Sequence, residues 1–202
     1  MRRGDAGRDA GIIDAMAASP DLAPQRLAVT SDIDAISALM KASVRALFPR
    51  YYDARQTASA EIHVAALDTV LIDDGTYYVH EDVRGGEIVA CGGWSRRNRL
   101  HAGAGEADDD ARLLDPRTEP ARVRAMFVRS DWTRRGLGRA ILESCERDAR
   151  AEGFTTLALM ATLPGVPLYR AFGFAETGRV MVRAPDGVEL AGVTMQRPIA
   201  PL

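Results

Sequence analysis

The stretch that decides the fold is Val123-Arg-Ala-Met-Phe-Val-Arg-Ser-Asp-Trp-Thr-Arg-Arg-Gly-Leu-Gly-Arg139, in which an apolar run is followed by two glycines. Residues 122–128 first alternate basic and apolar side chains and then become apolar throughout, which predicts a strand with at least one buried face. Gly136 and Gly138 let the backbone turn sharply and approach a ligand closely. The sequence therefore predicts a strand followed by a glycine loop.

An amphipathic helix is predicted directly after the loop, over residues 136–152. Apolar side chains recur at every fourth position along it: Leu137, Ile141, Cys145 and Ala149. Two favourable charge pairs are expected on its other faces: Glu143 with Arg147, and Glu146 with Arg150. Gly153 is expected to end the helix, and residues 154–160 resume as a short apolar strand. The unit reads strand, glycine loop, helix, strand.

The start of this helix predicts an anion site. The first amides of a helix have no partner within the helix, and the helix dipole places roughly half a positive charge there. An anion at such a position gains typically about 0.3 to 1 kcal/mol. We therefore expect the glycine loop to bind a phosphorylated ligand.

The spacing of the glycines separates the known kinds of phosphate loop. No Lys follows Gly138, so the P-loop pattern fails. Ile141 stands where a dinucleotide-binding loop has its third glycine, and the strand after the helix carries no acidic residue for a ribose. Both of these phosphate sites are disfavoured.

The loop Thr133-Arg134-Arg135-Gly136-Leu137-Gly138 resembles the cofactor loop of the GNAT superfamily of N-acetyltransferases. The pattern there is Arg or Gln, two residues, Gly, one residue, then Gly or Ala. Thr133 departs from it at the first position, while Arg134 and Arg135 keep the loop basic.

A second segment, Leu168-Tyr169 with Gly173-Phe174, resembles the late Leu-Tyr and Gly-Phe signature of the same superfamily. Thr162 occupies a place where these proteins often have Asn. The resemblance covers about residues 27–198 and is strongest over 122–174. It implies one α/β (α+β) domain over residues 25–202, with a mixed, mostly antiparallel sheet of about seven strands and about four flanking helices. Residues 1–24, rich in Ala, Asp, Gly and Arg, are expected to be a flexible extension.

The chain before the loop fits this plan. A short strand is predicted at residues 27–29, followed by a helix cap at Thr30-Ser31-Asp32 and an amphipathic helix with these core positions: Ile33, Ile36, Leu39, Met40 and Val44. A second helix is predicted at about Thr57 to Leu67, whose His63 is expected to be a surface or packed histidine rather than a base.

Further strands complete the predicted sheet. Residues 76–81 and 87–95 predict a hairpin, with Gly92-Gly93 indicating a bulge or a close backbone approach. Residues 96–119 are expected to form a mobile loop, and residues 190–196 a final strand. No metal site is expected, including at Asp108-Asp109-Asp110.

The resemblance implies that acetyl-CoA is the co-substrate and that its acetyl group passes directly, in a ternary complex, to a primary amine of a small molecule, peptide or protein. The resemblance also implies which residues bind acetyl-CoA: Met126, Phe127, Val128, Arg134, Arg135, Gly136, Leu137, Gly138 and Arg139. Backbone groups of Met126 and Val128 would lie along the pantetheine arm, and the loop amides would surround the pyrophosphate.

Tyr169 is implied as the general acid for the departing thiolate, because a phenol with a pKa of about 10 stays protonated at neutral pH. The base is open: residues 123–128 hold no carboxylate where some GNAT proteins carry a Glu, which leaves Glu81, Glu119 or a water chain. Residues 48–53, with Tyr51 and Tyr52, and residues 180–189 are expected to contact the acceptor, although simple anchoring of the loop by these tyrosines is an equal alternative.

Composition excludes some partners. A net charge of −2 and a pI near 6.0 give no overall attraction to nucleic acid or to an anionic membrane, and no apolar run is long enough to span a membrane. Cys91 and Cys145 are expected to be buried thiols in a cytoplasmic monomer or homodimer.

Two other functions stay open from the sequence. One is a regulatory module that binds acyl-CoA without catalysis. The other is a nucleic-acid-binding module that uses a local cluster of arginines: Arg122, Arg124, Arg129, Arg134, Arg135 and Arg139.

Overall fold

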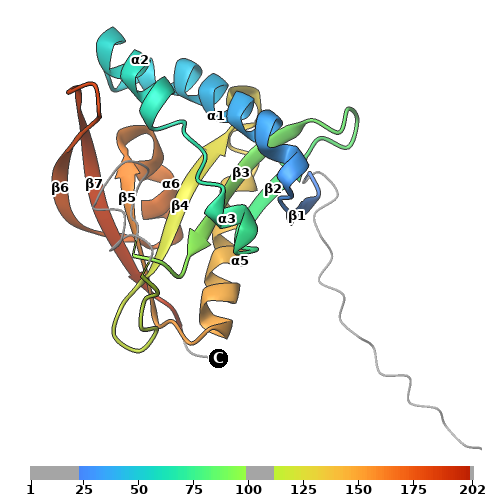
Figure 1. The fold of residues 1–202 in the computed structure, drawn as a ribbon, viewed down its shortest axis with the longest axis vertical. Helices are drawn as coiled ribbons and strands as arrows, with labels where there is room; N and C mark the ends of the chain where they lie inside the picture. The colour runs from blue at the N-terminus through green and yellow to red at the C-terminus, as the bar shows by residue number, and fades with distance from the viewer. Residues whose placement is uncertain (1–22, 99–111, 201–202) are drawn as a thin grey trace, which may run out of the picture.

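A seven-stranded sheet runs through the molecule in the order β1-β2-β3-β4-β5-β7-β6 (Figure 1). The computed structural model describes residues 23–98 and 112–200. Its strands are β1 (Gln25–Leu27), β2 (Tyr77–Glu81), β3 (Ile88–Ser95), β4 (Ala121–Val128), β5 (Thr156–Thr162), β6 (Ala175–Arg183) and β7 (Glu189–Pro198). All neighbours are antiparallel except β4 and β5, which are parallel. The predicted mixed, mostly antiparallel sheet is confirmed.

Five α-helices lie in the described residues, where about four were expected. They are α1 (Ile33–Leu47), α2 (Ala54–His63), α3 (Val70–Asp73), α5 (Leu137–Ala151) and α6 (Val166–Phe172). The additional one is α3, which is a single turn. Helices α1 and α2 cover one face of the sheet, and α5 covers the other (Figure 1).

Each face of the sheet has its own apolar core. On one face the predicted stripe of α5 is buried at all four positions: Leu137, Ile141, Cys145 and Ala149. On the other, α1 buries four of its five predicted core positions: Ile36, Leu39, Met40 and Val44. Burying an Ile, Leu or Met side chain contributes about 1.5 to 3 kcal/mol, so these stripes fix both helices on the sheet.

Some element boundaries differ from the prediction. The first strand is Gln25–Leu27 rather than 27–29. Helix α2 begins at Ala54 rather than Thr57, because the Asp53 side chain accepts a hydrogen bond from the Gln56 amide at 2.7 Å and the Gln56 side chain accepts one from the Asp53 amide at 3.1 Å. It ends at His63, short of Leu67.

Of the two charge pairs predicted on α5, one is present. Glu146 and Arg150 lie 2.9 Å apart. The expected pairing of Glu143 with Arg147 is wrong, because Glu143 accepts from Arg139, one turn earlier, and Arg147 donates to the adjacent Asp148. Gly153 follows the helix with a φ of +89°, the left-handed conformation that glycine adopts most easily, as predicted.

Some predictions lie partly or wholly outside the described residues. These are the flexible extension over residues 1–24, the mobile loop over residues 96–119, and the aspartates at 108–110. The predicted hairpin is confirmed as β2 and β3.

Candidate active site

Strands β4 and β5 separate soon after they begin. They pair only at Ala121 with Leu157 and at Arg122 with Ala158. Strand β5 then continues to pair with β7 over its whole length. Residues 123–128 of β4 therefore have an open edge on the β5 side, between the faces covered by α1 and α5.

A bulge interrupts β4 along this open edge. Cys91 of β3 pairs with Phe127, and Gly93 pairs with Arg124, so the single residue Gly92 lies opposite two residues of β4. One of these, Ala125, has a φ of +51°. A Cβ at Gly92 would lie 3.2 Å from the Cα of Met126. A bulge or a close backbone approach was predicted at Gly92-Gly93, and the structure has both.

The ladder with β3 fixes where the backbone groups of β4 point. The Arg129 amide donates to the Val89 carbonyl at 2.9 Å, and residues in an antiparallel ladder alternate between facing the partner and facing away. Val128 and Met126 therefore direct their amides and carbonyls toward the open edge. The Val128 carbonyl accepts a hydrogen bond from Ser43 Oγ of α1 at 3.0 Å. Backbone groups along this edge suit an extended polar arm.

The glycine loop that follows β4 has an unusual backbone. Arg134 has a φ of +64° and Gly136 a φ of +86°. Ala125 and Arg134 are the two non-glycine residues with positive φ in residues 23–98 and 112–200. Such conformations cost of order 1 to 3 kcal/mol and concentrate at functional sites. Arg134 is one of the residues that sequence analysis assigned to the cofactor, and Ala125 directly precedes Met126, the first of them.

Free amides collect at the start of α5. The first bond that closes a helical turn here runs from the Ala140 amide to the Gly136 carbonyl, at 2.9 Å. The amides of the three residues before Ala140 have no partner within the helix: Leu137, Gly138 and Arg139. Together with the positive end of the helix dipole, these amides suit a pyrophosphate.

Aromatic rings support the arginines of the loop. The Arg135 guanidinium lies 4.4 Å from the ring centre of Trp132, which also faces Arg129 at 5.7 Å. Arg139 lies 5.8 Å from the ring centre of Phe172, in α6. Cation–π contacts of this kind hold charged side chains in place while leaving them able to contact phosphates.

Leu137 and Gly138 belong to the buried side of the loop. The Leu137 side chain lies in the core, and a Cβ at Gly138 would lie 2.9 Å from Leu168 Cδ2 of α6. Gly138 is therefore needed for the contact between α5 and α6, a role that sequence analysis did not assign to it. Only the backbone amides of these two residues are available to a ligand.

Tyr169 lies on α6, the helix that contacts both β5 and α5. Its side chain is buried and packs edge-on against Phe174, with ring centres 5.8 Å apart. Burial raises the pKa of the Tyr169 hydroxyl above its usual value near 10. Tyr169 is therefore held as a neutral phenol, a potential proton donor.

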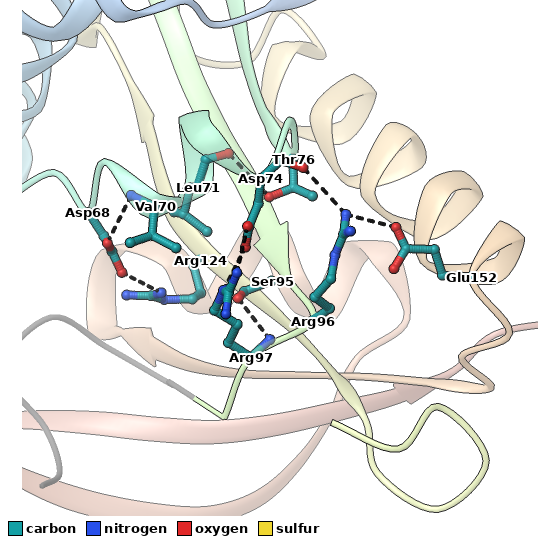
Figure 2. A network of polar contacts seen from close by, with 10 residues as sticks. All are labelled: Asp68, Val70, Leu71, Asp74, Thr76, Ser95, Arg96, Arg97, Arg124 and Glu152. Carbon is teal, nitrogen blue, oxygen red and sulfur yellow. Dashed lines mark hydrogen bonds and ion pairs between the residues drawn. The ribbon is translucent and has the colours of Figure 1, made fainter. Parts of the chain in front are cut away.

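Arg124, rather than a carboxylate, occupies the middle of β4. Its guanidinium donates to Asp68 at 2.8 Å, and both side chains are nearly buried. Figure 2 shows Arg124 directed toward Asp68, close to a second pair in which Arg97 contacts Asp74. These pairs tie the segment around α3 to β3 and β4.

The two carboxylates that sequence analysis considered as bases form ion pairs with arginines. Glu81 pairs with Arg26, beside β1. Glu119 pairs with Arg112 at 2.8 Å, before β4 begins, and the hydrogen bonds from Arg112 lower the pKa of Glu119 to about 2. A carboxylate with so low a pKa is a weak base.

The two tyrosines after α1 have different environments. Tyr51 is exposed. Tyr52 is buried, and its hydroxyl accepts from the Leu163 amide at 2.9 Å and donates to the Ala191 carbonyl at 2.7 Å. Tyr52 therefore anchors the end of β5 to β7, the simpler of the two roles considered for it.

Helix α2 is fastened to the turn between β6 and β7. Gln56 donates to the Glu189 carbonyl at 2.8 Å, and Ser59 donates to Asp186 at 3.0 Å. His63 lies 3.5 Å from the same carboxylate and is a packed surface histidine, as expected. Residues 180–183 belong to β6, so only residues 184–188 of the predicted loop 180–189 form the turn.

Several of the clustered arginines are paired with acids or amides. Arg129 contacts Glu87 at 2.7 Å and also Asp131, while Arg122 donates to Asn98. In the part of the chain that the structure describes, no helix is long and apolar enough to cross a membrane. The same residues hold no group of three or more potential metal ligands. Both cysteines are free and buried, as predicted.

Solved structures with this fold include a GCN5-related N-acetyltransferase from Rhodopseudomonas palustris, with a TM-score of 0.65 and 19% identity over 88% of this chain and 96% of the other. The PaiA N-acetyltransferase from Thermoplasma acidophilum, solved with coenzyme A, has a TM-score of 0.60 and 10% identity over 87% and 98%. A phosphinothricin acetyltransferase from Sinorhizobium meliloti, solved with acetyl-CoA, has a TM-score of 0.58 and 20% identity over 89% of each chain. Identities this low show a shared fold.

Sequence comparison is more specific. No curated protein is similar enough in sequence to match this chain. The profile of the acetyltransferase (GNAT) family matches residues 37–174, which include the open edge of β4, the glycine loop and Tyr169. The chain therefore belongs to the acetyltransferase (GNAT) family and is an acyltransferase.

Proposed function

We propose that the protein is an N-acetyltransferase that moves the acetyl group of acetyl-CoA to a primary amine of a small molecule, peptide or protein. The observation that carries this proposal is a continuous run formed by the edge of β4 that β5 leaves unpaired, the β4 bulge and the amides without a helical partner at the start of α5. An extended arm that ends in a pyrophosphate fits such a run. Solved proteins with this fold hold coenzyme A or acetyl-CoA.

Transfer occurs directly between the two bound substrates. The amine nitrogen forms a bond to the thioester carbonyl carbon, the carbon–sulfur bond breaks, the nitrogen loses a proton, and the thiolate gains one. Burial disfavours ionisation of both cysteines, raising the pKa of Cys91 to about 12. Neither thiol is therefore suited to carry the acetyl group as an intermediate.

The chain contributes mainly by positioning. The β4 backbone orients the thioester, and the amides of the loop bind the pyrophosphate, so the reacting groups meet in a fixed geometry. Tyr169 donates its proton to the leaving thiolate and is reprotonated from solvent. Its raised pKa keeps it in the donor form at neutral pH.

β4 carries Arg124 in place of a carboxylate. Without a base on this strand, the free-energy cost of deprotonating the amine depends on the pKa of the acceptor itself. An amine with a pKa of about 10.4 loses roughly 4.6 kcal/mol to deprotonation at pH 7, whereas an amine with a pKa near 7.8 loses only about 1 kcal/mol. We propose that acceptors with weakly basic amines, such as α-amino groups, react fastest.

Calorimetric titration with acetyl-CoA tests the proposal, with NAD and ADP as competitors. Micromolar binding of acetyl-CoA and none of NAD is expected. Gly136→Val should abolish binding, because a side chain there blocks the loop and resists a φ of +86°. Gly86→Val is the matched control, since Gly86 also has a positive φ but lies in the turn between β2 and β3.

Turnover distinguishes an enzyme from a regulatory module. Release of free CoA in the presence of a panel of amines is expected for the enzyme. Binding of acetyl-CoA without turnover on any amine would instead favour the non-catalytic module.

A further inference from the structure

The bulge in β4 is held from two strands away. Tyr77, on β2, donates a hydrogen bond from its hydroxyl to the carbonyl oxygen of Ala125 at 2.7 Å. Its side chain has no exposed surface. Strand β3 lies between the two residues, so the tyrosine ring spans the whole width of that strand.

Gly93 makes this reach possible. It pairs directly with Tyr77 in the ladder between β2 and β3. A Cβ at this position would lie 2.8 Å from Tyr77 Cδ2 and closer still to the Thr76 carbonyl oxygen. The absence of a side chain at Gly93 therefore lets the Tyr77 ring lie across β3 and place its hydroxyl at β4.

The Ala125 carbonyl needs such a donor. The extra residue of a bulge falls outside the ladder, and a positive φ turns its peptide group away from the neighbouring strand. A buried carbonyl without a donor is destabilising, so the tyrosine hydroxyl favours this conformation over a regular strand. Burial raises the pKa of Tyr77 well above its usual value, which keeps the donor proton in place.

Ser43 holds the same segment from α1. Its hydroxyl donates to the Val128 carbonyl, three residues after the bulge. Residues 125–128 are thus fixed at both ends by buried hydroxyl groups, on the strand whose other edge is open.

We infer that Tyr77 is a positioning residue for acetyl-CoA: its hydroxyl holds the Ala125 bulge, and the bulge sets the backbone of Met126 to Val128 in the geometry that receives the thioester arm. Tyr77 acts through β4 and does not touch the substrate. This inference rests on the proposed function and assigns a role to a residue outside the cofactor motif.

The test compares Tyr77→Phe with Tyr78→Phe. Tyr78 is the next residue on β2, is also buried, and also donates its hydroxyl, but to Asp148 near the end of α5. Each variant loses one hydroxyl hydrogen bond from the same strand, and only Tyr77→Phe loses the bond to the bulge. The measurements are acetyl-CoA affinity by calorimetry and amide hydrogen exchange in the peptide that covers residues 121–128. Both are made at a temperature where circular dichroism shows each variant folded.

Tyr77→Phe should bind acetyl-CoA at least tenfold more weakly than the wild type, and its residues 125–128 should exchange at least tenfold faster. Tyr78→Phe should stay within twofold of the wild type in both. Equal behaviour of the two variants would overturn the inference, as would faster exchange with unchanged affinity. Failure of the wild type itself to bind acetyl-CoA would overturn the proposed function, and the inference with it.

If Tyr77→Phe does not fold, Ser43→Ala gives the second measurement, because it removes the other hydroxyl that holds this segment and leaves Tyr77 in place. Weaker acetyl-CoA binding by Ser43→Ala, with residues 125–128 still protected from exchange, would overturn the inference, because affinity would then not depend on the order of the bulge. Equal loss of protection along residues 125–128 and of affinity would support the coupling of bulge and cofactor.

Discussion

Arg124 and Asp68 form a nearly buried ion pair, with 2.8 Å between the guanidinium nitrogen and the carboxylate oxygen. The exposed fractions of their side chains are 5% and 11%. The residues are 56 positions apart in the chain, and the pair joins the segment before α3 to the centre of β4. A cation therefore stands on the strand where some GNAT proteins carry a catalytic carboxylate.

Asp68→Asn should destabilise the protein by about 3 kcal/mol, because removing one partner leaves the other charge buried without compensation. Urea unfolding followed by circular dichroism measures the change in the free energy of unfolding. Glu143→Gln is the control, since its pair with Arg139 is exposed at both ends and should contribute less than about 1 kcal/mol. Similar losses for both variants would show that Arg124 has enough other partners to do without Asp68.

Tyr169→Phe should lower turnover by about 10²-fold and leave acetyl-CoA affinity unchanged, because a general acid acts in the chemical step. Initial rates of CoA release and calorimetry measure the two effects. Tyr78→Phe, which also removes a buried tyrosine hydroxyl, is the control. Normal turnover by Tyr169→Phe would remove it from the mechanism.

The pH dependence of the same variants gives a separate prediction. A phenol loses its proton above its pKa, and burial raises the pKa of Tyr169 above its usual value. The ratio of wild-type to Tyr169→Phe turnover should therefore stay constant from pH 7 to about pH 10. A ratio that falls between pH 8 and pH 10 would mean that Tyr169 ionises in that range.

Gly138→Ala should lower the affinity for acetyl-CoA by displacing α6 rather than by blocking the ligand directly. The added Cβ would lie 2.9 Å from Leu168, and a shift of α6 would move Tyr169. The double variant Gly138→Ala with Leu168→Ala should recover most of the acetyl-CoA affinity, because the smaller side chain makes room. If the double variant binds acetyl-CoA no better than Gly138→Ala, the added methyl group lowers affinity by contacting the ligand and not by contacting Leu168.

Cys91 and Cys145 should not react with a thiol reagent at pH 8 in the native protein. Both are buried, and burial raises the pKa of both thiols, so the reactive thiolate is scarce. A colorimetric disulfide reagent should report no free thiol in buffer and two in concentrated urea. Fast reaction of one cysteine in buffer would show that its surroundings open in solution.

Much of the fold could be predicted because its signals are local. The four-residue stripe of α5 and the glycines on each side of it fixed that helix within one residue at either end. Helix α2 was less well placed, since the sequence there has a weak stripe and its start depends on the reciprocal cap between Asp53 and Gln56. A capping pair was visible in the sequence and was the signal that could have located it.

The candidate site was also only partly predictable from the sequence. Gly92-Gly93 indicated the bulge, but the sequence held no sign that Ala125 would take the positive φ or that Arg134 would do so in the loop. The sequence also did not show why residue 138 is a glycine. A glycine that shapes a ligand loop and a glycine that allows two helices to pack cannot be distinguished until the position of Leu168 is known.

The sequence by itself determined the order of strand, glycine loop and helix, the faces that are buried, and the family signature around Tyr169, because periodicity and turn chemistry act over a few neighbouring residues. The tertiary structure alone decided which distant groups meet: Tyr77 with Ala125, Arg124 with Asp68, and Tyr52 with both Leu163 and Ala191. These contacts depend on strand order and register, which arise from the packing of the whole sheet between its two helical layers and not from any short stretch of chain.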